Sequence, residues 1–113
     1  MPQVNITVSK KLDDSTKNTL QFEIGTSIAI LPGKNIGNAM ICIQDGVSTY
    51  KNGEPVDGLF AEIRLYKNSP EESKKEYSEK LFQIFESVLG IKPELVYINF
   101  VELATWAAGG SYF

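Results

Sequence analysis

The chain has 113 residues, with 11 Lys and Arg against 14 Asp and Glu for a net charge of −3, and it contains one cysteine and no histidine. This length fits one domain, and a mildly acidic chain lacks the positive charge that supplies most nucleic-acid affinity, so no nucleic-acid partner is expected. A single cysteine excludes an internal disulfide and a multi-cysteine metal site. The lack of histidine leaves carboxylates, lysine, tyrosine or the terminal amine for proton transfer.

The first half of the chain predicts a strand, a helix and a second strand. Residues 3–8 alternate polar and apolar side chains in the pattern of a half-buried strand. Asp13 offers an N-cap for a helix, Gly33 and the proline before it end that helix, and a largely apolar strand follows at 38–44. The segment 45–58 has a loop composition, with a short strand near its middle. The apolar residues at helical spacing are Leu20, Ile24, Ile28 and Leu31.

The second half predicts the same order of elements. Residues 59–66 alternate as a strand, and Asn68 or Ser69 is the expected cap of a helix that has a proline in its first turn. Gly90 ends this helix, and the last long strand is expected at 95–101. The residues expected on the buried face of the helix are Tyr77, Leu81, Ile84, Phe85 and Val88.

The repeated order predicts a single α+β domain over 1–113, built from pseudo-repeats at about 2–57 and 58–113. Gly33 and Gly90, which each end a helix before a strand, lie 57 residues apart. Right-handed crossovers then give two β-α-β units, joined into a four-stranded sheet with both helices on one face. The apolar strand of each half is not mainly charged on either side, which is typical of sheets covered on both faces. A homotrimer packed sheet to sheet is therefore expected.

Pro2 is the first candidate for chemistry. Removal of Met1 before a small residue is common, and taken alone that is a sufficient reason for a proline at this position. Once uncapped, however, Pro2 carries a secondary amine. A free terminal amine has a pKa of about 7.7–8.0, and burial or a nearby cation lowers that pKa. Such an amine can act as a neutral general base in a chain that has no histidine.

Several short motifs occur in a fixed order along the chain: Met1-Pro2, Gly33-Lys34, Gly90-Ile91-Lys92-Pro93, Val96-Tyr97-Ile98-Asn99-Phe100 and Gly110-Ser111-Tyr112-Phe113. In this order and at these distances they resemble the tautomerase superfamily, specifically the family of macrophage migration inhibitory factor and D-dopachrome tautomerase, over essentially the whole chain. The resemblance implies a homotrimer with active sites between subunits. It also implies cofactor-independent keto–enol tautomerisation of phenylpyruvate-like and dopachrome-like 2-keto acids, with Pro2 as the base.

The resemblance also assigns polar residues to the site. Lys34 corresponds to the family's lysine beside the proline, where an ammonium can pair with a substrate carboxylate and lower the pKa of the amine. Tyr97 and Asn99 are two residues apart in a strand and share one face, so both can donate hydrogen bonds to a developing enolate. In the family these two positions come from the adjacent subunit. Without the family, Lys34 would be a solvated turn residue and Tyr97 a boundary aromatic.

Three aromatic residues complete the expected pocket. Tyr66 aligns with a usually apolar substrate-contacting position, where a larger ring would narrow the pocket, although an edge-strand aromatic is the equal alternative. Trp106 and Phe113 match apolar positions near the C-terminus. The family's better-known members often carry a further aromatic where this chain has Ala108, so the grip on a planar substrate is expected to be weaker.

Two other functions are open. The first is a cytokine-like binding or immunomodulatory protein with weak tautomerase activity. The second is isomerisation of a muconate-type acid, which needs another cation in the pocket, and Arg64 is a candidate whose direction the sequence leaves open.

Cys42 is expected to be a small buried residue of an apolar strand. The chain has no apolar run long enough for a membrane span and no secretory signal, so a cytoplasmic location is expected, or export without a signal peptide.

Overall fold

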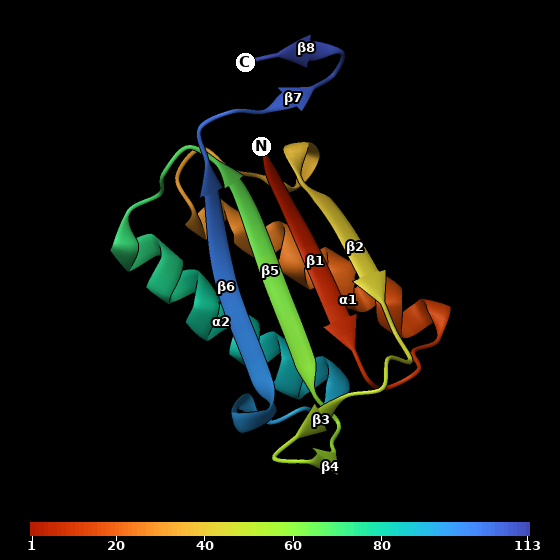
Figure 1. The fold of residues 1–113 in the computed structure, drawn as a ribbon. Coiled ribbons are helices and arrows are strands. Elements are labelled where there is room, and N and C mark those ends of the chain that lie inside the picture. The colour runs from red at the N-terminus through yellow and green to blue at the C-terminus, as the bar shows by residue number, and fades with distance from the viewer.

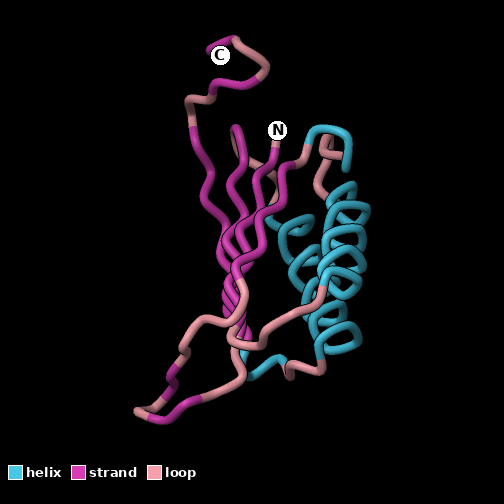
Figure 2. The backbone as a smooth tube through the Cα atoms, turned by 90° about the vertical axis from the view of Figure 1, so that its right-hand side faces the viewer, coloured by secondary structure: helices cyan, strands magenta, loops and turns pink.

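The computed structural model describes all 113 residues and contains a mixed four-stranded sheet with two helices on one face (Figures 1 and 2). The sheet order is β2-β1-β5-β6, and the helices α1 and α2 lie side by side against it. The two-layer fold expected from the sequence is therefore confirmed. The main elements are β1 (Pro2–Val8), α1 (Asp14–Ser27), β2 (Met40–Gln44), β5 (Leu59–Tyr66), α2 (Glu71–Leu89) and β6 (Val96–Leu103).

Shorter elements, including two separate two-stranded hairpins, lie at both ends of the sheet. One small hairpin lies at the end where β5 and β6 begin, and a second lies beyond the end where β1 begins (Figure 1). The sequence predicts a short strand in the first hairpin but not the second. The short elements are the 3-10 turns η1 (Ile28–Ile30), η2 (Ile36–Asn38) and η3 (Pro93–Leu95), and the strands β3 (Tyr50–Lys51), β4 (Glu54–Pro55), β7 (Ala107–Ala108) and β8 (Ser111–Tyr112).

Strand direction places the two halves of the chain head to tail. β1 pairs with β2 in parallel and β5 pairs with β6 in parallel, whereas the two central strands β1 and β5 are antiparallel. The start of β1 and the start of β6 therefore lie at opposite ends of the sheet (Figure 1). This arrangement decides which side chains can meet within one chain.

Local capping fixes the start of α1. The Asp13 carboxylate accepts a hydrogen bond from the Thr16 amide at 2.7 Å, as the sequence predicts. The α-helix ends at Ser27, and the chain continues as η1. The observed α-helix is therefore shorter than the apolar pattern of the sequence predicts. The residue after η1, Leu31, is nevertheless fully buried, because a 3-10 turn keeps the apolar side facing the core.

The start of α2 differs from the prediction. Neither Asn68 nor Ser69 caps the helix; Pro70 occupies the N-cap position, where no side chain bonds to the first turn. Instead, Glu102 at the end of β6 accepts hydrogen bonds from the Ser69 amide at 2.6 Å and from the Lys74 ammonium at 2.8 Å. A tertiary contact thus ties the segment before α2 and its first turn to the end of β6.

Two glycines have the left-handed backbone that the sequence predicts after each helix. Gly90 has a φ of 70° and ends α2, with its amide bonded to the Glu86 carbonyl at 2.9 Å. Gly33 has a φ of 77° in the turn after η1, and the next amide, that of Lys34, bonds to the Leu31 carbonyl at 3.1 Å. This turn brings Lys34 to the end of the sheet where β1 begins.

The core lies between the helices and the sheet. The Tyr77 hydroxyl donates a hydrogen bond to the Ile24 carbonyl at 2.9 Å and so ties α2 to α1, while burial raises the pKa of this phenol. Val88, expected on the buried face of α2, is half-buried at its edge. No helix is both long and apolar enough to cross a bilayer. The largest fully buried side chains include Tyr77, Phe85, Ile6, Leu20, Ile24, Ile28, Leu31, Ile63, Leu65, Leu81, Ile84 and Ile91.

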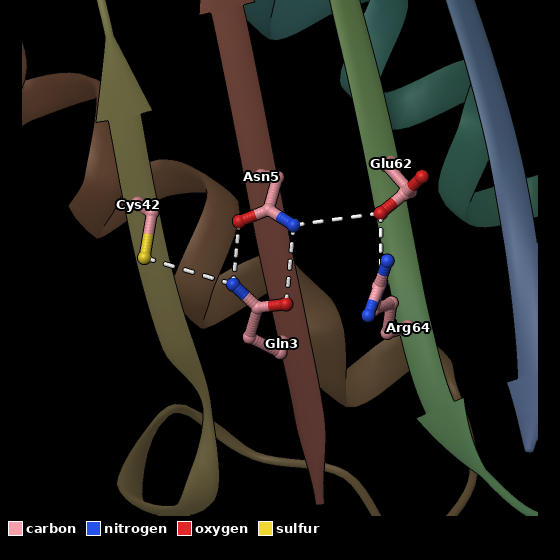
Figure 3. Close-up of polar contacts among 5 residues, drawn as sticks. All are labelled: Gln3, Asn5, Cys42, Glu62 and Arg64. Atoms are coloured by element: carbon pink, nitrogen blue, oxygen red, sulfur yellow. Dashed lines mark hydrogen bonds and ion pairs between the residues drawn. The ribbon is translucent and has the colours of Figure 1, made fainter.

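The opposite face of the sheet is open and carries a polar network (Figure 3). The side-chain amides of Gln3 and Asn5 bond to each other, and Asn5 reaches the Glu62 carboxylate at 3.5 Å. The Arg64 guanidinium pairs with the same carboxylate at 2.8 Å, which settles that its side chain lies on this open face. Cys42 also lies here and is exposed in the single chain, so the prediction that it is buried is wrong; its sulfur accepts from Gln3 at 3.6 Å.

Candidate active site

The first group of site residues surrounds the start of β1. Pro2 is buried and lies opposite Leu65 in the sheet, so Tyr66, the last residue of β5, is placed close by. Lys34 approaches from the turn after η1, and its ammonium donates to the Tyr66 carbonyl at 3.5 Å. The structure therefore brings together a proline, a lysine and a tyrosine that lie up to 64 residues apart in the sequence.

The electrostatic setting at this end favours a neutral amine. Burial lowers the pKa of the Met1 amine below its ordinary value, and the charge of the nearby Lys34 ammonium lowers it further. The Met1 amine, at the start of β1, therefore loses its proton more readily than a terminal amine in water.

A cavity of about 590 Å³ adjoins the start of β1. It lies between that strand, the turn η2 and the C-terminal hairpin, and its lining is largely apolar. Trp106 and Ala108 both line this cavity, so Ala108 stands where an aromatic residue would add contact area. The volume suits a small organic acid. The lining residues are Met1, Pro2, Gln3, Gly37, Asn38, Met40, Trp106, Ala107, Ala108 and Gly109.

The C-terminal hairpin brings two further aromatic residues to this end. The Phe113 amide bonds to the Trp106 carbonyl at 2.8 Å, and this bond folds the last residue back toward the sheet. The Phe113 ring stacks on Tyr66 with centroids 5.7 Å apart, and the Lys67 ammonium lies 5.2 Å from the Tyr66 ring centroid. Tyr66 ends a central strand, so the alternative that it is an edge-strand aromatic is wrong.

Tyr97 and Asn99 lie elsewhere. Both are exposed on the open face of β6, as their two-residue spacing predicts. Tyr97 pairs across the sheet with Phe60, which pairs with Thr7, five residues along β1 from Pro2. At roughly 3.3 Å per residue, this register puts Tyr97 about 17 Å along the sheet from Pro2. One copy of the chain does not place Tyr97 beside Pro2.

Sequence reasoning missed one cation. Lys51 of β3 places its ammonium 5.4 Å from the centroid of the Tyr97 ring. The two residues are 46 positions apart, and Lys51 lies in a loop-like stretch of Gly, Asn and Ser, where no periodic pattern marks it. The only signal in the sequence was the short strand expected near this position, which does not indicate a role for the lysine. Arg64, the candidate cation from the sequence, is instead neutralised by Glu62.

Comparison with known proteins identifies the fold. Neither models of protein families nor curated protein sequences give a match. Among solved structures, Leishmania major MIF2 superposes with a TM-score of 0.92 at 18% identity, covering 100% of this chain and 97% of that one. Pt0534 inactivated by 2-oxo-3-pentynoate gives 0.85 at 15% identity, covering 97% and 95%.

A third structure, a fused 4-OT solved as a symmetric trimer, superposes with a TM-score of 0.79 at 14% identity, covering 89% of this chain and 85% of that one. At such low identities the likeness speaks to the fold. The same two-helix, four-stranded arrangement is common to these structures and to this chain. The chain therefore has the fold that these MIF and 4-OT structures share.

Proposed function

We propose that the protein is a cofactor-independent tautomerase of aromatic 2-keto acids of the phenylpyruvate or dopachrome type, with Pro2 as its general base once Met1 is removed. The observation that carries this proposal is the buried start of β1, where the surroundings and the Lys34 ammonium lower the pKa of a terminal amine. Histidine usually supplies a base that is neutral at physiological pH, and this chain has none. The terminal amine fills that role in the proposal.

The proposed reaction moves one proton. The neutral nitrogen of Pro2 removes a proton from the carbon beside the carbonyl, and the electron pair moves onto the carbonyl oxygen. Lys34 pairs with the substrate carboxylate, while the Tyr97 hydroxyl and the Asn99 amide donate hydrogen bonds to the oxygen that becomes negative. Return of the proton to that oxygen gives the enol. The two tautomers differ only in the position of this proton, so the reaction as written needs no oxidant or reductant.

The proposal requires more than one copy of the chain. Since Tyr97 and Pro2 lie at opposite ends of one sheet, the donors must come from a neighbouring subunit. Large apolar side chains are available for such an interface on the sheet: Met40 is 67% exposed, Phe60 40% and Tyr97 63%. A ring of three copies closes such a head-to-tail contact, and the fused 4-OT of the same fold is a trimer. We therefore include a homotrimer in the proposal.

One observation favours a second candidate, a cytokine-like binding or immunomodulatory protein with weak tautomerase activity. Beside Trp106, the C-terminal wall of the cavity consists of the small residues Ala107, Ala108 and Gly109, which offer little further contact to a planar ring. A loosely held aromatic substrate would be turned over slowly. In this case the pocket is retained while binding to a partner is the main activity.

Tautomerisation of phenylpyruvate by the native protein and by a Pro2→Gly variant tests the first candidate. We expect activity in the native protein and a fall of at least about 100-fold in the variant, because a primary amine on a flexible residue replaces the held proline nitrogen. Mass spectrometry of the native protein should show that Met1 is absent. A Pro70→Gly variant, which changes a proline at the start of α2, should keep its activity. Equal and negligible rates in native and Pro2→Gly protein would leave only the binding function.

A further inference from the structure

The hairpin β3–β4 fixes an ammonium beside Tyr97. The Lys51 ammonium donates to the carbonyl of Glu94, in η3, at 2.6 Å, and lies 5.4 Å from the centroid of the Tyr97 ring. Figure 2 shows this hairpin leaning away from the helices, toward the open side of the sheet where Tyr97 is exposed. Two contacts from different elements therefore hold the cation on the same side as the donors Tyr97 and Asn99.

The charge of Lys51 is not neutralised within the chain. The four ion pairs of the structure involve Lys17, Arg64 and Lys74, and none involves Lys51. Glu54 stands opposite Lys51 in the hairpin register, yet it forms no ion pair with it. An exposed ammonium with only a carbonyl and a ring as partners retains hydrogen-bonding capacity for an anion.

A hollow of about 380 Å³ adjoins this ammonium. Its lining includes aromatic rings and the Lys51 side chain, a combination that can receive an aromatic acid. Glu94, whose backbone carbonyl accepts from the Lys51 ammonium, lines it as well. Among its lining residues, those that the argument uses are Lys51, Phe60 and Tyr97.

We propose that Lys51 contacts the substrate and selects 2-keto acids that carry a second carboxylate, remote from the reacting carbonyl. This proposal rests on the proposed tautomerase function and trimer. Lys34, at the Pro2 end, pairs with the carboxylate next to the carbonyl. Lys51 enters the composite site together with Tyr97 of the neighbouring subunit, so it meets the other end of the substrate. Arg64 is excluded from this role by its ion pair with Glu62.

A matched pair of substrates tests the proposal. Phenylpyruvate and (4-carboxyphenyl)pyruvate differ only by the second carboxylate. We expect kcat/KM to favour the dicarboxylate in the native protein, and Lys51→Gln to reduce that preference about tenfold through KM while kcat changes little, since a charge-assisted hydrogen bond is lost. Lys51→Arg should restore the preference. Lys92→Gln, which removes a lysine charge near the same end of the sheet, should leave it unchanged.

A binding measurement makes the test independent of turnover. The unreactive acids 3-phenylpropanoate and 3-(4-carboxyphenyl)propanoate are titrated into native and Lys51→Gln protein by calorimetry. Tighter binding of the dicarboxylate that depends on Lys51 supports the proposal even if Pro2-dependent activity is absent, in which case only the tautomerase function fails. Equal effects of Lys51→Gln on both members of a pair, or no effect on either, would overturn it. Circular dichroism and gel filtration check that each variant is folded and assembled.

Discussion

The two halves of the chain, 2–57 and 58–113, share one plan and contribute different parts of the site. Each is a strand, a helix and a parallel strand, but the halves join through antiparallel β1 and β5. The first half supplies Pro2 and Lys34 at one end of the sheet, and the start of β6 supplies Tyr97 at the other. An internal repeat of this kind separates groups that a single site needs, and a second copy of the chain can reunite them.

Mixed assemblies provide the strongest test of this division. A Pro2→Gly chain keeps its Tyr97 end, and a Tyr97→Ala, Asn99→Ala chain keeps its Pro2 end; each alone should lose about 100-fold or more in activity. Refolding the two variants together in equal amounts should restore about a quarter of native activity, because about a quarter of subunit boundaries then combine an intact Pro2 end with an intact Tyr97 end. Phenylpyruvate turnover measures the recovery.

Each variant refolded with itself is the control for the mixing experiment. Absence of recovery in a mixture whose size matches the native assembly would show that Pro2 and Tyr97 do not act in one site.

The next largest effect is expected at Lys34. Replacement by Gln removes the partner of the substrate carboxylate, so kcat/KM should fall about 30-fold. The same change removes a cause of the lowered pKa of the terminal amine, so that pKa rises. Because the base must be neutral, activity increases as pH rises through the pKa of the amine, and the inflection in Lys34→Gln should lie at higher pH than in the native protein. A pH profile of kcat/KM measures the shift.

Lys92 provides a control from the second half of the chain. It follows Gly90 much as Lys34 follows Gly33, but it caps η3 just before β6, at the opposite end of the sheet, and is exposed. Lys92→Gln should therefore leave both the rate and the inflection unchanged. An equal pH shift in both variants would indicate a general charge effect and contradict the role of Lys34.

The smallest expected effect is on the free energy of unfolding and concerns the residues at the start of each helix. Glu102→Gln weakens the contact with Ser69 and Lys74 and should reduce the free energy of unfolding by about 1–2 kcal/mol. The Lys74 ammonium and the Ser69 amide lower the pKa of Glu102, so this stability is present above the ordinary carboxyl pKa and is lost as pH falls through the lowered value. Urea unfolding should show a smaller difference at pH 3 than at pH 7.

Asp13→Ala, at the exposed local cap of α1, should cost less than Glu102→Gln at pH 7. An equal or larger loss at Asp13 would show that the tertiary contact of α2 is no stronger than a local cap.

Much of the fold was accessible from local patterns. The strand 59–66 matches β5 residue for residue, and Asp13 and Gly90 cap their helices as expected. These features depend on the side-chain period and on backbone preferences, which neighbouring residues encode. The predicted cap of α2 was wrong because Pro70 takes the N-cap position and the Ser69 amide bonds to Glu102, 33 residues away. The prediction that Cys42 is buried was wrong because an apolar strand at a sheet edge is not covered within one chain.

For the site, the sequence by itself determined the residue types: a proline next to Met1, a lysine after a helix-ending glycine, and a tyrosine and an asparagine on one strand face. Only the tertiary structure decided that Lys34 lowers the pKa of an amine at the start of β1, that Phe113 stacks on Tyr66, and that Lys51 stands beside Tyr97. The physical reason is that periodicity fixes which face a side chain takes. Distance between residues far apart in the chain depends on strand order and direction, and here these place the halves head to tail.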